Sequence, residues 1–446
     1  MTHHPFGLTR TPMTALPIDP ILPDLVAALR AHGRAVLQAP PGAGKTTRVP
    51  LAMLDANLTG GRIIMLEPRR LATRAAAERL AETLGEPVGQ TIGYRMRGES
   101  AVGKATRVEV VTEGILTRMI QSDPELTGIG AVIFDEFHER SLNADLGLAL
   151  AWEIRAALRP DLILLVMSAT LDAGPVATLL DDAPILTSEG RAFPVTTHHL
   201  PKALPKITRL EQTTADLIIQ AVSETTGGVL VFLPGEGEIR RVESALSGRL
   251  PKDCAIRPLY GALPFAAQRA AIAPVKEGRK IVLSTSIAET SLTIADIRVV
   301  IDAGRSRRAR FDPSSGMSRL VTEKVSRAEA TQRAGRAGRV AEGACYKLWT
   351  KGEDGALPAF PPAEIEAADL APLALELAQW GSDDLAFLTP PPEGTLAEAR
   401  RLLTSLGALD KQHRITAHGR AIAALPTHPR LAHMLLTAGQ QAAPLA

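Results

Sequence analysis

Short apolar segments without strict polar alternation recur along the first third of the chain. They are rich in β-branched residues and leucine, and longer stretches of helical character separate them. A strand that is covered on both faces needs no polar face, so such runs are typical of parallel sheets wrapped by helices. The sequence therefore predicts an α/β domain with a parallel sheet. Its strands are expected at AVLQAP (35–40), RIIMLEP (62–68), RVEVVTE (107–113), AVIFDE (131–136) and LILLVMSAT (162–170).

The same pattern restarts after a looser, proline-containing stretch at 193–205 and predicts a second α/β domain. The turn-rich stretch 351–362 predicts a boundary. Beyond it, residues 368–381 and 395–409 have the apolar spacing of helices, so the remainder is expected to be mostly helical. The strands of the second domain are expected at GVLVFLPG (228–235), AIRPLYG (255–261), KIVLSTS (280–286) and IRVVIDAG (297–304).

The composition is that of an ordinary globular protein. Of the 446 residues, 45% are apolar and 22% are charged, and no run approaches the roughly 20 apolar residues of a membrane span. Two cysteines, Cys254 and Cys345, are too few for a disulfide framework, and the histidines lack metal-ligand spacing. No apolar signal core opens the chain. We expect a cytoplasmic protein without a membrane segment or a structural metal, and a disordered leader over residues 1–12.

Charge is distributed unevenly along the chain. Lys+Arg 50 and Asp+Glu 48 give a net charge of +2, but residues 298–339 hold ten arginines and one lysine against four acids, a local +7. Arginine supplies 39 of the 50 cations, which reflects either the base composition of the gene or phosphate binding. Aromatic residues, at 3%, are too scarce for a base-stacking sheet. A nucleic-acid strand would therefore be held by its backbone.

The segment Ala39-Pro-Pro-Gly-Ala-Gly-Lys-Thr46 follows an expected strand and precedes a helical stretch. In this setting backbone N–H groups at a helix N-terminus surround phosphates, with Lys45 at the outer phosphates and Thr46 on Mg²⁺. Ala39 stands in place of the usual first glycine, and Pro50 is expected to kink the helix after its first turn. The alternative is a Gly-Pro turn with a surface lysine. The expected nucleotide contacts are Pro41, Gly42, Ala43, Gly44, Lys45, Thr46 and Thr47.

Two adjacent acids follow the strand AVIF, 90 residues after Lys45, in the segment Asp135-Glu-Phe-His138. Ligands gather at the C-terminal edge of open parallel sheets. Asp135 is expected to hold the Mg²⁺ hydration shell, and Glu136 to act as general base toward the attacking water. The alternative is an acidic pair that merely ends a strand and caps the next element.

The next expected strand ends in Ser168-Ala-Thr170. Small hydroxyl residues at a strand end are common, so the segment gains meaning only from its place after the acids. Ser168 and Thr170 are expected to couple changes at Asp135 and Glu136 to the second domain through hydrogen bonds that switch partners.

The second domain carries Gln332-Arg-Ala-Gly-Arg-Ala-Gly-Arg339. Arginines with glycine spacers at helix-turn positions present their cations in one direction, which suits a triphosphate approached from across a cleft. Arg336 and Arg339 are expected to be arginine fingers, and Gln332 to orient the water that attacks the phosphate near Lys45. An exposed basic helix is the alternative.

Together these motifs resemble the superfamily 2 helicases, specifically the DEAH-box group and within it the bacterial HrpB-type ATP-dependent helicases. The resemblance covers nearly all of residues 13–438. DEFH stands where the group name reads DEAH, and Phe137 occupies the variable place, so the catalytic roles are unaffected. Four further segments carry the resemblance: Glu67-Pro-Arg-Arg70, Thr112-Glu-Gly-Ile-Leu116, Leu230-Val-Phe-Leu233 and Ser284-Thr-Ser-Ile-Ala-Glu-Thr-Ser-Leu-Thr293.

The resemblance implies two RecA-like domains, over 13–195 and 196–355, that close on ATP and Mg²⁺ at their interface, with His138 at the nucleotide site. It implies a winged-helix-like segment over 356–414 and the start of a helical ratchet domain over 415–446. HrpB-type proteins continue far beyond this point, so the sequence looks truncated or frameshifted.

The resemblance also implies how a nucleic-acid strand is held. Residues 305–325 resemble the β-hairpin with which DEAH-type helicases part duplexes. Arg305 stands where relatives place an aromatic that stacks on the nucleotide base, and Arg74 or Arg79 is expected to supply the opposing stack. Backbone contacts are expected from Arg69, Arg70, Thr112 and Gly114 in the first domain and from Thr285 and Thr290 in the second. For each, local capping or solvation is the alternative.

Three hypotheses follow. The first is an ATP-dependent RNA helicase that moves along a single strand and separates duplexes, with DNA as a possible substrate because only the 2′-hydroxyl distinguishes the two backbones. The second is a nucleic-acid-stimulated ATPase that clamps or remodels ribonucleoprotein without separating strands. The third is a binder without catalytic activity. Protein partners are not predicted.

Overall fold

The computed structural model describes residues 15–169, 173–190, 193–205, 208–275, 277–289, 294, 296–312 and 315–438. The expected leader over residues 1–12 lies outside these ranges, as do Thr170, Thr290 and the last eight residues. Within the described part of the chain, no helix has both the length and the apolar character to cross a membrane.

The first sheet has the strand order β4-β3-β5-β2-β6-β7-β1-β8, and all neighbours are parallel except β3 and β4. Its central strands β6 and β7 are buried along their whole length, which explains their unbroken apolar sequence. The bounds are β1 Arg34–Gln38, β2 Arg62–Glu67, β3 Ile92–Met96, β4 Glu99–Ala101, β5 Val108–Thr112, β6 Ile129–Phe134, β7 Ile163–Ser168 and β8 Ile185–Thr187.

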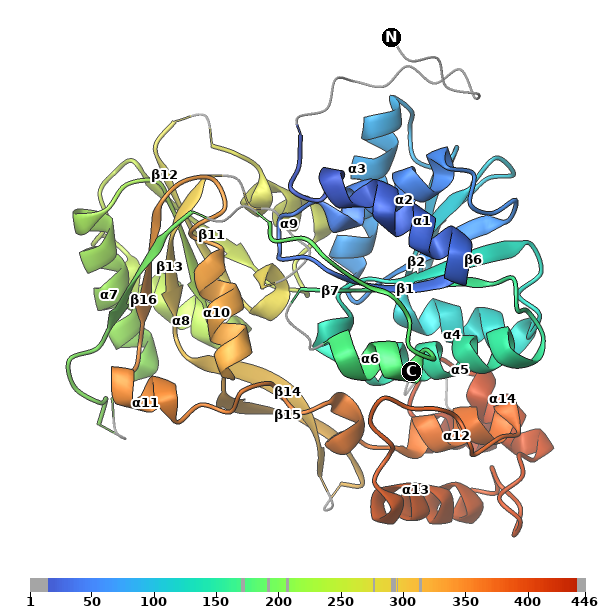
Figure 1. Ribbon diagram of the computed structural model, residues 1–446. Helices are drawn as coiled ribbons and strands as arrows, with labels where there is room; N and C mark the ends of the chain where they lie inside the picture. The colour runs from blue at the N-terminus through green and yellow to red at the C-terminus, as the bar shows by residue number, and fades with distance from the viewer. Residues whose placement is uncertain are drawn as a thin grey trace.

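Helices cover both faces of this sheet (Figure 1). One core cluster holds residues of α1, α2 and α3, and another holds residues of α4, α5 and α6. The bounds are η1 Asp19–Ile21, α1 Leu22–His32, α2 Lys45–Asp55, α3 Arg70–Leu84, α4 Glu113–Ser122, η2 Phe137–Glu139, α5 Leu142–Ala157 and α6 Ala173–Leu179. Helix α2 continues through Pro50 for five further residues, so the proline does not end it.

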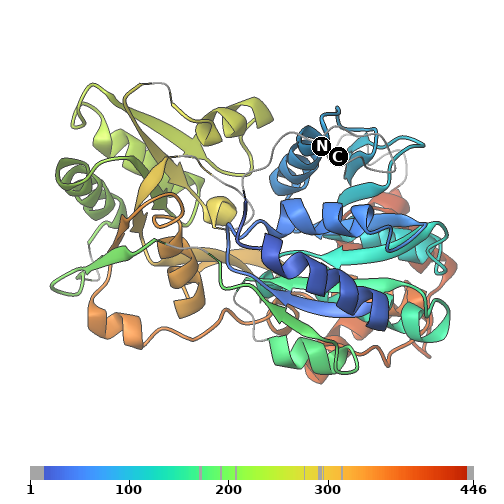
Figure 2. The same ribbon diagram turned by 45° about the horizontal axis from the view of Figure 1, so that its top comes forward.

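The second sheet is wholly parallel, in the order β11-β12-β10-β13-β16-β9. Figure 2 shows the two sheets side by side, each with its own helices. The strands are β9 Val195–His199, β10 Gly228–Phe232, β11 Cys254–Leu259, β12 Arg279–Ser284, β13 Ile297–Asp302 and β16 Gly343–Lys347. The helices are α7 Leu210–Glu224, α8 Glu236–Leu246, α9 Phe265–Ile272, η3 Ser286–Ala288, α10 Arg327–Gly335 and α11 Lys351–Gly355. The expected α/β fold class with two parallel sheets is confirmed.

An antiparallel hairpin leaves the second sheet and points toward the C-terminal segment (Figure 1). It consists of β14 (Arg305–Asp312) and β15 (Met317–Lys324), paired from Arg305 with Lys324 to Asp312 with Met317. These strands are the two extended runs expected within 305–325.

The C-terminal segment is helical, as its apolar spacing predicts, and it packs on the first domain. Its buried residues Ile365, Leu373 and Leu403 share one core cluster with α4 and α5. Trp380 Nε1 donates to Glu153 Oε2 on α5 at 2.6 Å. The elements are η4 Glu364–Glu366, α12 Ala371–Trp380, α13 Glu393–Ser405, α14 Ala417–Ala424 and α15 Pro429–Ala438, with one antiparallel bridge between Leu409 and Ile415.

Candidate active site

The expected phosphate loop connects β1 to α2, which begins at Lys45. Gly42 and Gly44 have φ angles of +87° and +101°, in the left-handed region that side chains rarely adopt. A β-carbon on Gly44 would also lie 2.6 Å from Leu16 Cδ1. Pro41 and Ala43 lie within the loop, and Thr46 and Thr47 lie in the first helical turn. The glycines are therefore needed for the backbone path of this loop.

Lys45 joins the loop to the two acids that follow β6. Its Nζ lies 2.7 Å from Glu136 Oε1 and 3.8 Å from Asp135 Oδ1, and all three side chains are buried. Burial opposes the charged ammonium, but the two carboxylates outweigh it and raise the pKa of Lys45. Burial likewise opposes ionisation of Glu136, but Lys45 outweighs it and lowers the pKa of Glu136 to about 2. The site thus holds a desolvated, fully ionised pair.

Asp135 and Thr46 offer the oxygen atoms that Mg²⁺ prefers. The Thr46 hydroxyl donates to Asp135 Oδ2 at 2.5 Å, so both oxygens face the same point. Within the described residues, no group of three His, Cys, Asp or Glu side chains forms a complete metal cage. Mg²⁺ commonly binds through one or two protein oxygens together with water and substrate phosphates, so this sparse donor set fits that ion.

Glu136 has one carboxylate oxygen engaged and one available. Oε1 accepts from Lys45, whereas Oε2 is buried, lies 3.4 Å from His138 Nε2 and accepts no hydrogen bond within the described part of the chain. Its backbone is in the left-handed region, with φ +52°, and its N–H donates to Asp135 Oδ1 at 2.8 Å. An ionised, buried oxygen without a donor suits a group that accepts a proton from water.

His138 connects the two domains. The Ala169 N–H lies 3.4 Å from its Nδ1, and Gln332 Nε2 of α10 lies 3.0 Å from its Nε2. Burial lowers the pKa of His138, so the ring is neutral near pH 7. A neutral imidazole accepts a hydrogen bond at one nitrogen only, so the tautomer decides which of these two contacts is a hydrogen bond to the ring. The acids of the first domain and α10 of the second therefore meet through one imidazole.

The three arginines of the second domain have different surroundings. Arg333 is buried, contacts Glu289 at 3.1 Å and Asp302 at 2.8 Å, and stacks on Phe232. Arg336 is also buried and donates from Nε to the Glu289 carbonyl at 3.0 Å. Burial and the neighbouring Arg339 lower the pKa of Arg336. Arg333 is therefore a structural anchor for the turn that carries Arg336.

Arg339 reaches the phosphate loop from the second domain. A β-carbon placed on Gly42 would lie 3.9 Å from Arg339 Nε. Burial lowers the pKa of Arg339 to about 10, which leaves the guanidinium charged at pH 7. The structure thus brings Arg339 to the nucleotide loop across the interface.

Ser168 ends β7, as expected, and it lies next to the phosphate loop. It is buried, and its carbonyl accepts from Ala39 N at 3.0 Å. Its neighbour Ala169 contacts His138. Ser168 therefore lies between the phosphate loop and the residue that joins the domains.

Of the residues expected to contact a nucleic-acid strand, those that the structure describes lie at or just after the C-terminal ends of β2, β5 and β12. Arg69 donates to the Ser286 carbonyl at 2.5 Å and to Glu139 at 3.1 Å, and so bridges the two domains. Arg70 is exposed. Thr112 precedes α4, Gly114 faces open space, and Thr285 precedes η3.

The arginines expected to stack on a base, Arg305 together with Arg74 or Arg79, are not brought together by any contact in the described residues. Arg79 is exposed on α3 and pairs with Glu82 of the same helix at 2.7 Å. Arg305 begins β14, and its carbonyl accepts from Arg333 at 3.3 Å. Their stacking role stays a prediction. Arg74 stacks instead on Phe265 of the second domain, 4.1 Å from the ring centre.

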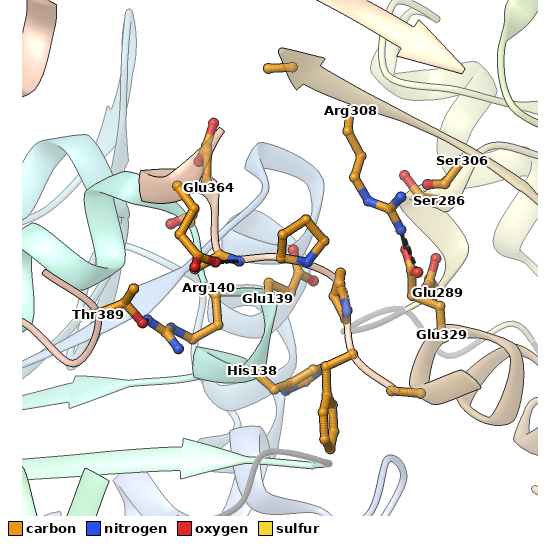
Figure 3. A pocket seen from close by; sticks show the side chains of 18 of the residues that line it. His138, Glu139, Arg140, Ser286, Glu289, Ser306, Arg308, Glu329, Glu364 and Thr389 are labelled. Atoms are coloured by element: carbon orange, nitrogen blue, oxygen red, sulfur yellow. Dashed lines mark hydrogen bonds and ion pairs between the residues drawn. The ribbon is translucent and has the colours of Figure 1, made fainter. Parts of the chain in front are cut away.

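A cavity of about 640 Å³ lies between the first domain, the hairpin and the C-terminal segment. Figure 3 shows His138 at one end, Arg140, Glu364 and Thr389 on one wall, and Arg308, Glu289 and Glu329 on the other. Sequence reasoning missed Glu289, Arg333 and Arg140 as residues of the site. Glu289 lies in the segment 284–293 and Arg333 in the arginine motif, so these motifs could have identified both residues. Arg140 follows DEFH and belongs to no motif of its own.

Comparison with known proteins decides the family. Residues 21–179 match the DEAD/DEAH box helicase model, and residues 211–341 match the helicase conserved C-terminal domain. The chain belongs to the DEAD/DEAH box helicases. Both matched domains are those of ATP-hydrolysing enzymes.

The chain is similar to two helicases of Escherichia coli K12. It is 50% identical to the ATP-dependent RNA helicase HrpB over 430 residues, which cover 96% of this chain and 53% of that protein. It is 36% identical to the ATP-dependent RNA helicase HrpA over 436 residues, 95% of this chain and 33% of that protein. A crystal structure of Escherichia coli DEAH/RHA helicase HrpB superposes with a TM-score of 0.90 at 49% identity, covering 96% of this chain and 55% of that one. The chain thus spans about half the length of HrpB and a third of HrpA.

Proposed function

We propose that the protein is an ATP-dependent RNA helicase that hydrolyses ATP between its two α/β domains and moves along single-stranded RNA. One observation carries this proposal: His138, next to the catalytic acids, contacts Gln332 of the second domain at 3.0 Å. A residue shared between the hydrolysis site and the opposite domain couples the nucleotide state to domain closure. Similarity to helicases named for RNA supports RNA as the substrate.

Each catalytic side chain has a distinct task in the proposed reaction. When bound, Mg²⁺ would neutralise charge on the phosphate oxygens, held through Thr46 and Asp135. Lys45 binds the outer phosphates, and Glu136 Oε2 accepts the proton of the attacking water. Gln332 orients that water. Arg336 and Arg339 stabilise the negative charge of the transition state from the second domain.

The proposed substrate path follows Arg69, Arg70, Thr112 and Gly114 in the first domain and Thr285 and Thr290 in the second. These residues suit phosphate and sugar contacts, which hold a strand without reading its sequence. We expect the protein to act in the cytoplasm, where its two free cysteines, Cys254 and Cys345, stay reduced.

The test is steady-state ATPase of the purified chain, alone and with single-stranded RNA or DNA, alongside Glu136→Gln. We expect stimulation by RNA above DNA, and a Glu136→Gln variant that binds ATP but turns it over about 10²- to 10⁴-fold more slowly. Normal hydrolysis by Glu136→Gln would refute the assignment of the base.

A duplex-unwinding assay separates the proposal from its rival. Stimulated ATPase without strand separation would favour a clamp or ribonucleoprotein remodeller, and strand binding without ATPase a non-catalytic binder.

A further inference from the structure

The turn that carries Glu136 and His138 has an unusual backbone. It consists of η2 (Phe137–Glu139), with Glu136 at φ +52° before it and Arg140 at φ +51° after it. Residues other than glycine adopt this left-handed region only where surrounding contacts hold them there. Lys45 and the N–H bond to Asp135 hold the Glu136 end. What holds the Arg140 end therefore also sets the position of the catalytic side chains.

Arg140 is held by the C-terminal segment as well as by its own domain. Its guanidinium donates to Asp145 through Nε at 3.0 Å and Nη2 at 2.9 Å, and Nη2 also donates to Thr389 Oγ1 at 2.9 Å. Its carbonyl accepts from Glu364 N at 3.1 Å. Thr389 and Glu364 follow Arg140 by 249 and 224 residues, so the C-terminal segment contacts both the side chain and the backbone of this residue.

Glu364 also fixes the start of the next helix. Its Oε2 accepts from Leu142 N at 2.8 Å, a backbone donor that α5 itself leaves unpaired. Ser141 caps the same helix by accepting from Ala144 N at 3.0 Å, and its hydroxyl donates to Glu113 at 2.6 Å. In Figure 3, Arg140, Thr389 and Glu364 lie on one wall of the cavity, with His138 beyond them. Residues of the C-terminal segment thus hold the turn between β6 and α5 in place.

We propose that Arg140, held by Thr389 and Glu364, is a positioning residue for ATP hydrolysis, which makes the C-terminal segment part of the catalytic apparatus. This inference rests on the proposed ATPase function. Arg140 touches none of the reacting groups. It acts by fixing the turn on which Glu136 Oε2 and His138 are placed, and a small misplacement of a general base is costly in rate.

The test compares Thr389→Val with Thr389→Ser and Thr404→Val. Valine keeps the shape of threonine but cannot accept from Arg140, whereas serine keeps the hydroxyl. Thr404 is the matched control, because its hydroxyl donates to the Arg400 carbonyl within α13. We measure kcat and KM for ATP with saturating single-stranded RNA, together with thermal unfolding. We expect Thr389→Val to lower kcat about 5- to 20-fold with KM within twofold, Thr389→Ser to restore kcat, and Thr404→Val to match wild type.

The outcomes distinguish this inference from the proposed function. Absence of turnover in the wild-type chain would overturn the ATPase proposal and this one with it. Turnover in wild type with an unchanged kcat in Thr389→Val would overturn only the positioning role. The positioning role would also be overturned by a loss of kcat that Thr389→Ser does not restore or that Thr404→Val shares. Either result would mean that the contact contributes only to the stability of the fold.

Hydrogen exchange gives a readout that does not depend on turnover. Thr389→Val is expected to speed exchange of the amides of residues 136–142, with Thr404→Val unchanged. Equal protection in both variants would show that the contact does not fix the turn.

Discussion

At the scale of single residues, the site is governed by the competition between burial and pairing. Lys45, Asp135 and Glu136 lie together with almost no exposure, and burial alone would neutralise all three. Their proximity keeps Lys45 and Glu136 ionised. A ligand that draws Lys45 away would leave Glu136 a stronger base, because the charge that lowers its pKa would move. The ion pair therefore keeps the Lys45 ammonium close to where it would bind a phosphate, and it lowers the basicity of Glu136.

Replacing Lys45 by methionine is expected to reverse the pH dependence of stability that Glu136 contributes. In wild type the folded pKa of Glu136, about 2, lies below its ordinary 4.5, so this stabilisation is complete above pH 4.5 and is lost as pH falls toward 2. In Lys45→Met burial raises the pKa instead, so stability is lost as pH rises above 4.5. At pH 7 we expect a deficit of about 3–5 kcal/mol, measured by chemical unfolding between pH 4 and 8.

The control for this prediction is Lys45→Met combined with Glu136→Gln. Replacing the Glu136 carboxylate, which has lost its partner Lys45, is expected to recover about 2 kcal/mol of the free energy of unfolding at pH 7 and to make that free energy less dependent on pH. A single Lys45→Met variant that is equally stable at pH 5 and pH 8 would contradict the ion pair.

At the scale of elements, the hairpin changes the meaning of the local charge. Residues 298–339 carry a net charge of +7, but several of their cations form ion pairs within the fold. Arg310 forms two bonds to Glu323, both at 2.7 Å, and Arg308 pairs with Glu329. Arg319, by contrast, is 70% exposed and lies 3.7 Å from Asp312. Only the structure separates arginines that stabilise the hairpin from those that face solvent.

Arg319→Ala and Arg310→Ala are expected to affect RNA binding in different ways. If the exposed Arg319 neutralises a phosphate, its loss lowers the slope of log Kd against log salt by about 0.7. Arg310→Ala removes a paired cation, so the slope is expected to stay unchanged while the hairpin becomes less stable. Fluorescence anisotropy with single-stranded RNA over a salt series measures both slopes. Equal slopes in Arg319→Ala and wild type would remove Arg319 from the strand path.

At the scale of the whole molecule, the sequence predicted elements better than contacts between them. The central strands were readable because burial on both faces leaves unbroken apolar runs. Edge strands such as β8 and β9 were not predicted from the sequence because they are short and mostly exposed. The helical C-terminal segment was expected, but an amphipathic helix does not say which surface it covers. Only the structure shows that this segment packs on α4 and α5 and contacts Arg140.

The motif residues illustrate the same limit. Asp135, Glu136 and the phosphate loop were predicted together because parallel strands bring their C-terminal ends to one edge. The separate surroundings of Arg333, Arg336 and Arg339 were not readable, since three arginines with equal spacing look alike in sequence. Burial and partners assign Arg333 to the internal ion pairs and Arg339 to the interface.

Arg339 provides a test of domain closure. It belongs to the second domain, yet it lies beside Gly42 of the phosphate loop, and its guanidinium stays charged at pH 7. We expect Arg339→Ala to lower kcat by about 10³- to 10⁵-fold while ATP affinity changes little, because an arginine finger acts mainly on the transition state. Arg339→Lys is expected to recover only part of the loss, since an ammonium lacks the planar fork. Single-turnover ATPase and a fluorescent nucleotide titration measure the two quantities.

Arg240→Ala is the matched control, because Arg240 is exposed on α8 and pairs there with Glu236. It is expected to retain wild-type turnover. If Arg339→Ala lost ATP affinity as strongly as turnover, Arg339 would be a ground-state ligand of ATP and not an arginine finger. If it kept both, Arg339 would not be an arginine finger, and Arg336 would be the one arginine of the pair left to stabilise the transition state from the second domain.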